Sequence, residues 1–373
     1  MSIMNANASI EVKSASYGAT ARLKKAMNRL AELAPLESPI LSCFVDLTDT
    51  RYLTVEKLEL QVKELTRSCD EEEKSAILES FALIKHHLLE DVSDEASGCA
   101  IYARSGSRLF FEALEFGVTL ETRILINELP QIYPLVETRD TYERFIVVVV
   151  TEGGARILET TMGSITREIF REKPALRERL GREWTREHYQ SHKRDRDERF
   201  VRTKVEIVEE LMRQRGHNHL VVSGSPKMVS RFTSALPKRL QEQVVSTLTS
   251  HPNSGIDLIV EEAVALSVEK ENSDSQKRVA LLKAQLFSGG LAVAGVDSSR
   301  RALLQGYADT LVIDHDLPGA DQEELVRLAV RSGVDVETVK NSKELERLGG
   351  VGCLLRYRPS GINHSQDESL IAS

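Results

Sequence analysis

The sequence lacks the patterns that are typical of secreted proteins, membrane-spanning proteins and proteins stabilised by a bound metal. Its four cysteines, Cys43, Cys69, Cys99 and Cys353, are far apart and show no paired spacing, which argues against a zinc knuckle or a disulfide framework. The longest apolar run, Phe145 to Val150, is far too short to span a bilayer, and no basic N-terminal start leads into an apolar core. We therefore expect a soluble globular protein in the reducing cytoplasm, with no membrane partner.

Patterns for nucleotide hydrolysis, a serine nucleophile and metal binding are also missing. No Walker-type glycine-rich loop occurs, and the three Gly-Gly pairs are better interpreted as turns. Gly224-Ser225-Pro226 lacks the following glycine of a nucleophile elbow. His188 and His192 have the spacing of two ligands on a helix, but the glutamate of a zincin pattern does not stand beside the first histidine. The sequence thus predicts no metal site and no cofactor.

Charge is spread unevenly along a chain that is long enough for several domains. Its 373 residues, 41% of them hydrophobic, can form two or three domains that each bury a core. The formal net charge of −8 argues against a surface that is basic throughout. Between Arg167 and Lys204, however, thirteen Lys or Arg accompany eight Asp or Glu, a local charge of +5. This segment predicts either a surface for RNA phosphates or, because the signs are mixed, a solvated helix face.

A first α/β domain is predicted over residues 21–143, after a tail of residues 1–20. It opens with a helix, followed by a strand from Pro39 to Leu47. Two helices follow, each with apolar residues at helical spacing: Val55, Leu58, Val62 and Leu65 in one, and Ile77, Phe81, Ile84 and Leu88 in the other. Gly98 to Ala103 and Arg108 to Leu114 are expected to form a hairpin.

A second domain is predicted over residues 144–252. The strand Phe145 to Val150 returns as Ala155 to Glu159 after a double-glycine turn. A long helix from about Arg194 to Arg215 follows, with an apolar face of Val201, Val205, Val208 and Met212. The next strand is His219 to Val222, and Ser225 is the expected N-cap of a helix that begins at Pro226.

A third domain is predicted over residues 253–358, with a flexible tail at 359–373. Ala302 to Leu304 continue a short helix that Gly306 ends, and Leu311 to Ile313 form a buried strand. A turn at Gly349-Gly350 precedes the apolar run Val351 to Leu355. Short buried strands next to helices imply α/β layers, so the expected fold class is α/β (α+β) with three domains.

Several segments carry a family resemblance, because they occur in the same order and with similar spacing. They are ILSCFVDL, IVVVVTEGGARILET, HNHLVVSGSP, LAVAGVDSSRRALLQGYADTLVIDHDL and LGGVGCLLRY. The chain resembles a bacterial release-factor-like family related to archaeal and eukaryotic class-1 peptide chain release factors and Pelota. The resemblance implies an RNase-H-like central domain and a C-terminal domain like kink-turn-binding ribosomal proteins.

The reactive tip of such proteins is altered in this chain. In true release factors a Gly-Gly-Gln tip enters the peptidyl transferase centre, where glycine permits close backbone approach and the glutamine amide orients water. This chain has no Gly-Gly-Gln, and the corresponding segment, Gly181 to Gln190, has Arg186 where a glutamine would fall. The resemblance therefore leaves open whether peptidyl-tRNA is hydrolysed, with Gln190 either the catalytic candidate or an ordinary surface residue.

The same segment supplies the candidates for RNA binding: Trp184, Arg186, Lys193, Arg194, Arg196, Arg199 and Arg202. Trp184 either stacks on a base or packs against its own domain. The basic residues either bind phosphates of ribosomal or transfer RNA, or pair locally with the interleaved Asp195, Asp197 and Glu198.

The outer domains carry weaker indications. No Asn-Ile-Lys-Ser motif, which reads stop codons in the resembling termination factors, occurs between Thr54 and Leu89, so stop-codon decoding is not expected. The resembling families bind a translational GTPase through the third domain, in the segment that matches Gly306, Asp309 and Asp314 here. The alternative is that these three residues only shape a turn and a strand end.

The resemblance implies a cytoplasmic, ribosome-associated, release-factor-like protein that rescues stalled ribosomes, with or without ester hydrolysis. Its expected partners are the ribosome and tRNA, with a translational GTPase as a further candidate and no DNA. The alternative is a non-catalytic adaptor that keeps the three-domain scaffold and recruits protein partners through its acidic outer domains. Arg186 in place of glutamine favours this alternative.

Overall fold

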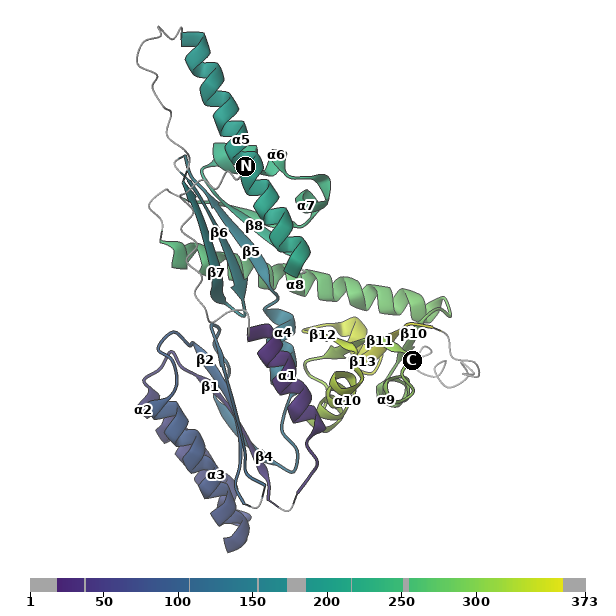
Figure 1. Cartoon of the computed structure of the whole chain (residues 1–373). Helices are drawn as coiled ribbons and strands as arrows, with labels where there is room; N and C mark the ends of the chain where they lie inside the picture. The colour runs from purple at the N-terminus through teal and green to yellow at the C-terminus, as the bar shows by residue number, and fades with distance from the viewer. Residues whose placement is uncertain are drawn as a thin grey trace, which may run out of the picture. The chain divides into compact units, whose positions relative to one another are not determined.

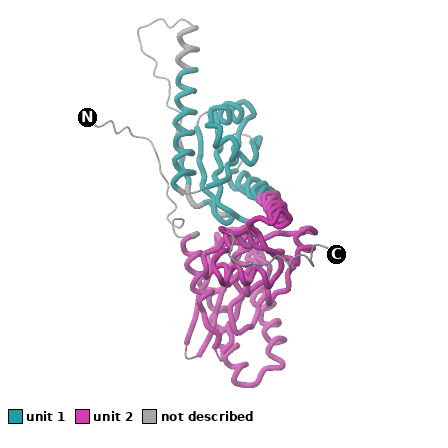
Figure 2. The backbone as a smooth tube through the Cα atoms, turned by 90° about the vertical axis from the view of Figure 1, so that its right-hand side faces the viewer, with its two compact units in different colours: residues 1–19, 142–270 teal, residues 20–141, 271–373 magenta. Residues whose placement is uncertain are grey.

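The computed structural model describes residues 19–36, 38–106, 108–152, 154–172, 186–215, 217–250 and 255–357. The chain divides into two compact units, coloured separately in Figure 2. Unit 1 contains residues 142–270, and unit 2 contains residues 20–141 together with the segment that starts at Glu271. Apart from Ala19 and Thr20, the predicted tails 1–20 and 359–373 lie outside the described residues. The predicted domain boundaries stay predictions.

Unit 2 contains two sheets, of which the first is fully antiparallel with the strand order β3-β2-β1-β4. Its strands are β1 (Ile40–Asp46), β2 (Gly98–Arg104), β3 (Phe110–Phe116) and β4 (Arg123–Asn127). The hairpin expected from the sequence is confirmed, since Gly98 pairs with Phe116 and Arg104 with Phe110. Its strand β4 was not expected, because RILIN is short and carries an arginine.

Helices cover both faces of this sheet (Figure 1). Helices α2 (Arg51–Leu65) and α3 (Glu71–Glu90) pack against Leu41, Cys43 and Val45, which alternate along β1. The apolar residues predicted for the two helices are buried except Leu65, which is 44% exposed at the end of α2. Asp70 caps α3 by accepting a hydrogen bond from the Glu73 N–H at 2.8 Å. On the opposite face, α1 (Ala19–Glu32) buries Leu23, Met27 and Leu30.

The second sheet of unit 2 has the strand order β10-β13-β11-β12, with β11 and β12 parallel and the other pairs antiparallel. Its strands are β10 (Ala292–Ala294), β11 (Ala308–Asp314), β12 (Asp335–Val339) and β13 (Val351–Leu355). The helices here are α9 (Val296–Leu304), α10 (Gly319–Ser332), α11 (Lys343–Arg347) and the C-terminal half of α8 (Ile256–Phe287). The predicted helix end at Gly306 is confirmed, as are the buried strand at Leu311 to Ile313 and the apolar run Val351 to Leu355, which form β11 and β13. Gly306 has the positive φ of +76° that ends such helices.

Two side chains of α10 connect the two sheets of unit 2. The Glu323 carboxylate accepts hydrogen bonds from the N–H groups of Ile132 and Tyr133, both at 2.9 Å, at the start of α4 (Tyr133–Thr141). These donors would otherwise be unpaired, because the first N–H groups of a helix have no partner within it. One turn along α10, Arg327 donates to the carbonyls of Leu30 at 3.0 Å and Pro130 at 2.5 Å. The residues before β1 and after β4 are thereby held against the second sheet.

Unit 1 is built on one five-stranded sheet with the order β7-β6-β5-β8-β9. The strands are β5 (Phe145–Val150), β6 (Gly154–Thr161), β7 (Ser164–Glu172), β8 (His219–Gly224) and β9 (Val244–Thr249). Strands β5, β8 and β9 are parallel, whereas β6 and β7 run antiparallel to their neighbours. The sequence did not predict β7, because SITREIFRE carries four charged residues.

Helices α5 (Arg186–Arg215), α6 (Pro226–Ala235) and α7 (Lys238–Glu242) complete unit 1 with the first half of α8. Val201, Val205 and Val208 of α5 pack on one face of the sheet, and the apolar residues of α8 pack on the other. The helix α5 begins at Arg186 rather than at the predicted Arg194. Ser225 stands at the N-cap of α6 as predicted, but its hydroxyl makes no capping hydrogen bond to a described residue.

The expected α/β (α+β) fold class is confirmed by these three sheets and the helices against them. Within the described part of the chain, no helix has both the length and the apolar character needed to cross a membrane.

Replacing Glu323 with alanine tests the connection between the sheets of unit 2. We expect Glu323→Ala to lower the free energy of unfolding by about 2–4 kcal/mol, since two buried N–H groups lose their acceptor. Urea denaturation of the full chain, followed by circular dichroism, measures the change. Glu324→Ala is the matched control, because the neighbouring Glu324 pairs with Arg300 at the surface and such pairs contribute about 1 kcal/mol or less. Equal losses in the two variants would contradict the capping role.

Candidate functional site

The segment expected to form the reactive tip is described only in part. Trp184 lies outside the described residues. Arg186, Gln190 and Lys193 lie in the first turns of α5, so the backbone there is helical, but their side chains are not described. The catalytic hypothesis for Gln190 and the RNA-binding hypothesis for Trp184, Arg186 and Lys193 therefore stay predictions.

The remaining candidates, Arg194, Arg196, Arg199 and Arg202, lie on the described part of α5, and three of them are exposed. The side chains of Arg194 and Arg202 are 81% and 84% exposed. These arginines are exposed because α5 turns its apolar positions toward the sheet, which leaves the charged positions to solvent. Arg196 is different, since only 23% of its side chain is exposed.

The arginines of α5 differ in their partners. Arg194 faces Glu198 at 3.8 Å and Arg202 faces Glu206 at 3.7 Å, both one helical turn apart. This is the local pairing that the sequence offered as an alternative to RNA contact. Exposed pairs of this kind contribute about 0.3–0.5 kcal/mol, so a phosphate could replace the carboxylate at little cost. Arg199 is exposed and has no ion-pair partner among the described residues.

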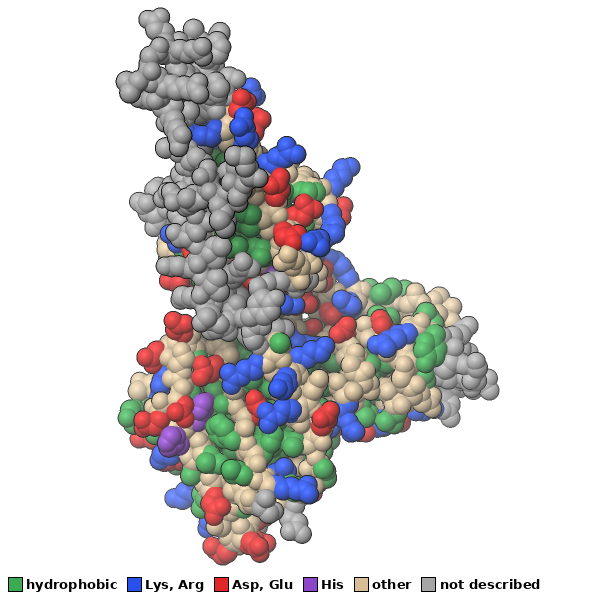
Figure 3. All heavy atoms as spheres, in the orientation of Figure 1, with side chains coloured by type: hydrophobic (Ala, Val, Ile, Leu, Met, Phe, Trp, Pro, Cys, Tyr) green, Lys and Arg blue, Asp and Glu red, His purple; other side chains and the backbone are tan. Residues whose placement is uncertain are grey.

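A shallow hollow of about 560 Å³ lies between α5 and α6 in unit 1. It is lined by Arg194, Asp197, Glu198, Lys227, Ser230, Arg231 and Ser234. Arg231 donates to Asp197 at 3.1 Å, which fixes α6 against α5. Basic and acidic side chains alternate over this part of the surface (Figure 3). The sequence analysis did not single out Lys227 and Arg231, although their spacing of four residues on an amphipathic helix would have indicated a shared face.

A buried contact between a histidine and a carboxylate lies at the base of α5. The imidazole of His217, just before β8, lies 3.1 Å from the carboxylate of Glu159 on β6, and both side chains are almost fully buried. Glu159 pairs across the sheet with Ile146 of β5. The pair therefore fixes the loop that follows α5 to the sheet. Hydrophobic patterning could not have revealed it, because the two residues are far apart in the sequence.

The three residues that match the GTPase-binding segment of the resembling families lie in unit 2. Gly306 ends α9 with a positive φ, and Asp309 pairs with Arg356 at 3.2 Å at the surface. Asp314 ends β11, where its carboxylate accepts a hydrogen bond from the Asp316 N–H at 3.0 Å and where burial raises its pKa. All three thus have local structural roles, and the GTPase contact stays a prediction.

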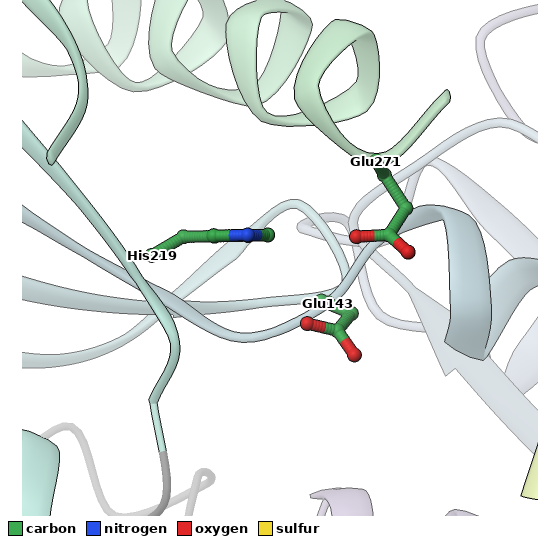
Figure 4. A group of neighbouring side chains, drawn as sticks. All are labelled: Glu143, His219 and Glu271. Carbon is green, nitrogen blue, oxygen red and sulfur yellow. The ribbon is translucent and has the colours of Figure 1, made fainter. Parts of the chain in front are cut away.

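Some side chains have the chemistry of metal ligands. Figure 4 shows Glu143, just before β5, and His219, at the start of the adjacent parallel strand β8, together with Glu271 of α8. In unit 1, a ligand atom of Glu143 and one of His219 lie within 4.8 Å of each other. One imidazole and one carboxylate are fewer than the three protein ligands typical of catalytic zinc, so we assign no metal to this pair.

Unit 2 contains a cluster of three carboxylates, Asp140, Glu271 and Glu337, whose oxygens lie within 4.8 Å of one another. Arg278 pairs with Glu337 at 2.8 Å. Burial and the nearby Glu337 raise the pKa of Asp140 to about 7, although hydrogen bonds from Thr338 oppose the shift. Arg278 and the raised pKa of Asp140 both reduce the negative charge of the cluster, and we assign no metal to it.

The comparisons with known proteins agree with the family resemblance over part of the chain. Residues 130–269 match the family model described as bacterial archaeo-eukaryotic release factor family 10. The match covers nearly all of unit 1 together with α4. The release-factor-like recognition made from the sequence is confirmed by this match. No curated protein is similar enough to the chain to count as a relative.

Solved structures of similar proteins match over long stretches at low identity. The archaeal translation termination factor aRF1 is 16% identical, with 91% of this chain and 98% of that chain covered and a TM-score of 0.28. Archaeal Pelota, from a model of ribosome-bound Pelota and ABCE1, is 14% identical, with 90% and 94% covered and a TM-score of 0.44. Dom34 of S. cerevisiae, a translation termination-like factor, is 12% identical, with 71% and 82% covered and a TM-score of 0.42. TM-scores below 0.5 do not establish a shared structure of the whole chain.

Removing the acidic neighbours of the α5 arginines tests whether this face binds RNA. We expect Glu198→Gln with Glu206→Gln to tighten binding to a short single-stranded RNA by several-fold, because Arg194 and Arg202 then have no competing carboxylate. Fluorescence anisotropy at several salt concentrations measures the affinity. The matched control, Glu261→Gln with Glu262→Gln, changes the charge equally at exposed positions of α8 in the same unit. An unchanged affinity in the first variant would contradict an RNA-binding role for this face.

Proposed function

We propose that this protein is a cytoplasmic, ribosome-associated, release-factor-like factor that acts on stalled or idle ribosomes by occupying the transfer-RNA site. The observation that carries the proposal is the family match over residues 130–269, which nearly coincides with unit 1. The ribosome and tRNA are the proposed partners, and a translational GTPase is a further candidate.

The described surface of unit 1 supports an electrostatic contact with RNA. The α5 helix presents Arg194, Arg199 and Arg202 to solvent, on a rigid helix whose opposite face is packed into the core. Arg199 has no ion-pair partner among the described residues, and the pairs of the other two are long and exposed. Arginines in this state can contact phosphates without giving up a strong internal interaction.

Whether the bound factor also hydrolyses the peptidyl-tRNA ester depends on the tip. A glutamine amide positions water there in true release factors, whereas this chain has Arg186 in that position and Gln190 one helical turn further on. The two candidate functions are therefore release of the nascent chain through Gln190 and a non-catalytic adaptor that occupies the site and recruits other proteins. Arg186 favours the adaptor, since an arginine cannot act as a general base or orient water as an amide does.

Co-sedimentation with ribosomes tests the proposal directly. We expect the full chain to pellet with empty or stalled ribosomes, and the affinity to fall as salt rises. Charge reversal at three arginines, Arg194→Glu, Arg199→Glu and Arg202→Glu, should weaken binding at least tenfold. It should also reduce the salt slope by about one for each phosphate that the variant no longer binds.

The matched control reverses three charges elsewhere in unit 1, with Arg213→Glu, Lys238→Glu and Arg239→Glu. These residues are also exposed, so the net charge changes equally while the N-terminal half of α5 stays intact. Thermal melting of each variant shows that it is folded. Absence of pelleting in every ribosomal state would refute the proposed function, and equal losses in both variants would refute the role of the α5 arginines.

Replacing Arg186 with glutamine separates release from adaptor activity. On a stalled complex that carries labelled peptidyl-tRNA, we expect the wild type to leave the ester intact and Arg186→Gln to release peptide measurably, because the glutamine restores an amide at the tip. Gln190→Ala is the parallel variant, which matters only if the wild type is active. Peptide release by the wild type that disappears in Gln190→Ala would overturn the adaptor function.

A further inference from the structure

A second basic site lies in unit 2, at the turn between β2 and β3. A hollow of about 490 Å³ opens there beside the segment that leads into β1. It is lined by Pro35, Leu36, Ser38, Arg104, Ser105, Arg108 and Glu128. All of these residues belong to the first sheet or its connections, so the hollow is formed within one part of the chain. Its volume is that of a site for a small organic ligand rather than for a single ion.

The feature that indicates a ligand is the guanidinium of Arg104. Arg104 ends β2 and is only 4% exposed. Among the described residues, its Nε has no hydrogen-bond partner and no carboxylate pairs with it. Burial and the neighbouring Arg108 both lower the pKa of Arg104. A buried charge without an anionic partner is costly, so an anionic ligand that paired with Arg104 would offset this cost.

The surrounding residues hold this arginine in a fixed frame. Ser105 is fixed to α3, since its N–H donates to Ser80 Oγ and its hydroxyl donates to the Ala76 carbonyl, both at 2.8 Å. Gly106 follows with φ +96°, and a Cβ placed on it would lie 3.1 Å from Ser38 Oγ. The hairpin turn therefore passes directly against the segment before β1. Ser38 and the exposed Arg108 also line the hollow, so a hydroxyl and a second guanidinium accompany Arg104.

We propose that this hollow binds the phosphate group of a nucleotide, with Arg104 as the buried anchor and Arg108 as the exposed second contact. Guanidinium groups match phosphate oxygens because their N–H donors form a planar fork. Glu128, also exposed at the hollow, repels a lone anion but accepts hydrogen bonds from ribose hydroxyls or a base amino group. A phosphate attached to a nucleoside thus fits the lining better than inorganic phosphate. The inference goes beyond the proposed function and does not depend on ribosome binding.

The stability of an Arg104 variant distinguishes a ligand site from a structural arginine. If Arg104 serves only the fold, its loss should lower the melting temperature. If Arg104 serves to bind an anion, Arg104→Met should melt at the same temperature as the wild type or higher, because the substitution removes an unpaired buried charge. It should also lose the stabilisation that the ligand gives to the wild type.

The test measures the melting temperature of the full chain with three separate probes. They are inorganic phosphate, adenosine 5′-monophosphate and a short uridine oligonucleotide. We expect the monophosphate or the oligonucleotide to raise the wild-type melting temperature by roughly 2–4 °C, and inorganic phosphate by less. The rise should vanish in Arg104→Met and shrink in Arg108→Met, an exposed substitution that does not threaten the fold. Arg67→Met, an exposed arginine of the same unit, should respond like the wild type.

The probes identify the source of the phosphate. A response to the monophosphate indicates a free nucleotide, and a response to the oligonucleotide alone indicates an RNA strand. No response of the wild type to either probe, or an undiminished response in Arg104→Met, would overturn the proposal. Ribosome pelleting is measured separately, so a chain that pellets without responding to nucleotides refutes this site alone. A chain that responds without pelleting refutes the proposed function alone.

Discussion

The structure of unit 2 depends on one carboxylate. Glu323 accepts two backbone N–H groups at the start of α4, and Arg327, one turn away, donates to backbone carbonyls beside the first sheet. These bonds join residues that are 190 to 297 positions apart in the chain. Burial raises the pKa of Glu323, while the N–H groups oppose that shift. A buried acid is tolerated here because backbone donors and a nearby guanidinium replace the missing water.

Whether the fold supplies a partner also distinguishes charged side chains with a structural role from those that are candidates for binding an anion. His217 with Glu159, Arg231 with Asp197, and Arg278 with Glu337 are pairs in which the fold supplies both partners. Arg104 and Arg199 differ, because neither has an ion-pair partner among the described residues. One is buried in a hollow of unit 2 and the other is exposed on a helix of unit 1, so they point to two separate contacts with anions. Both predicted contacts would weaken as salt rises, although the buried one less steeply.

The proposed function rests on unit 1, in which the sheet supports α5. A parallel core of β5, β8 and β9 supports α5, whose apolar face is anchored and whose charged face is free to meet RNA. The family match covers this unit almost completely. The altered tip determines what the bound protein could do next, since an arginine offers charge where release factors offer an amide.

The sequence alone determined those features that depend on local patterns. Apolar runs and alternation predicted β1, β2, β5, β8, β11 and β13, helical spacing predicted α2 and α3, and glycines marked the ends of elements. The family resemblance was also visible, because it rests on short apolar segments in a fixed order. Strand β7 was missed because four of its nine residues are charged and its apolar residues show no regular alternation.

Only the tertiary structure decided which charges are paired. Four arginines of α5 looked alike in the sequence. Arg194, Arg196 and Arg202 face carboxylates, and Arg196 is also mostly buried, whereas Arg199 has no ion-pair partner among the described residues. Arg104 lay in an ordinary hairpin, and nothing in its neighbours indicated that the turn would bury it with no ion-pair partner among the described residues. Glu323 lay among other acids of α10, and its role came from donors in a helix far earlier in the chain. Local sequence sets propensity and pattern, but the partner of a charge is brought to it by the fold, and the energy of a charge depends on that partner and on its burial.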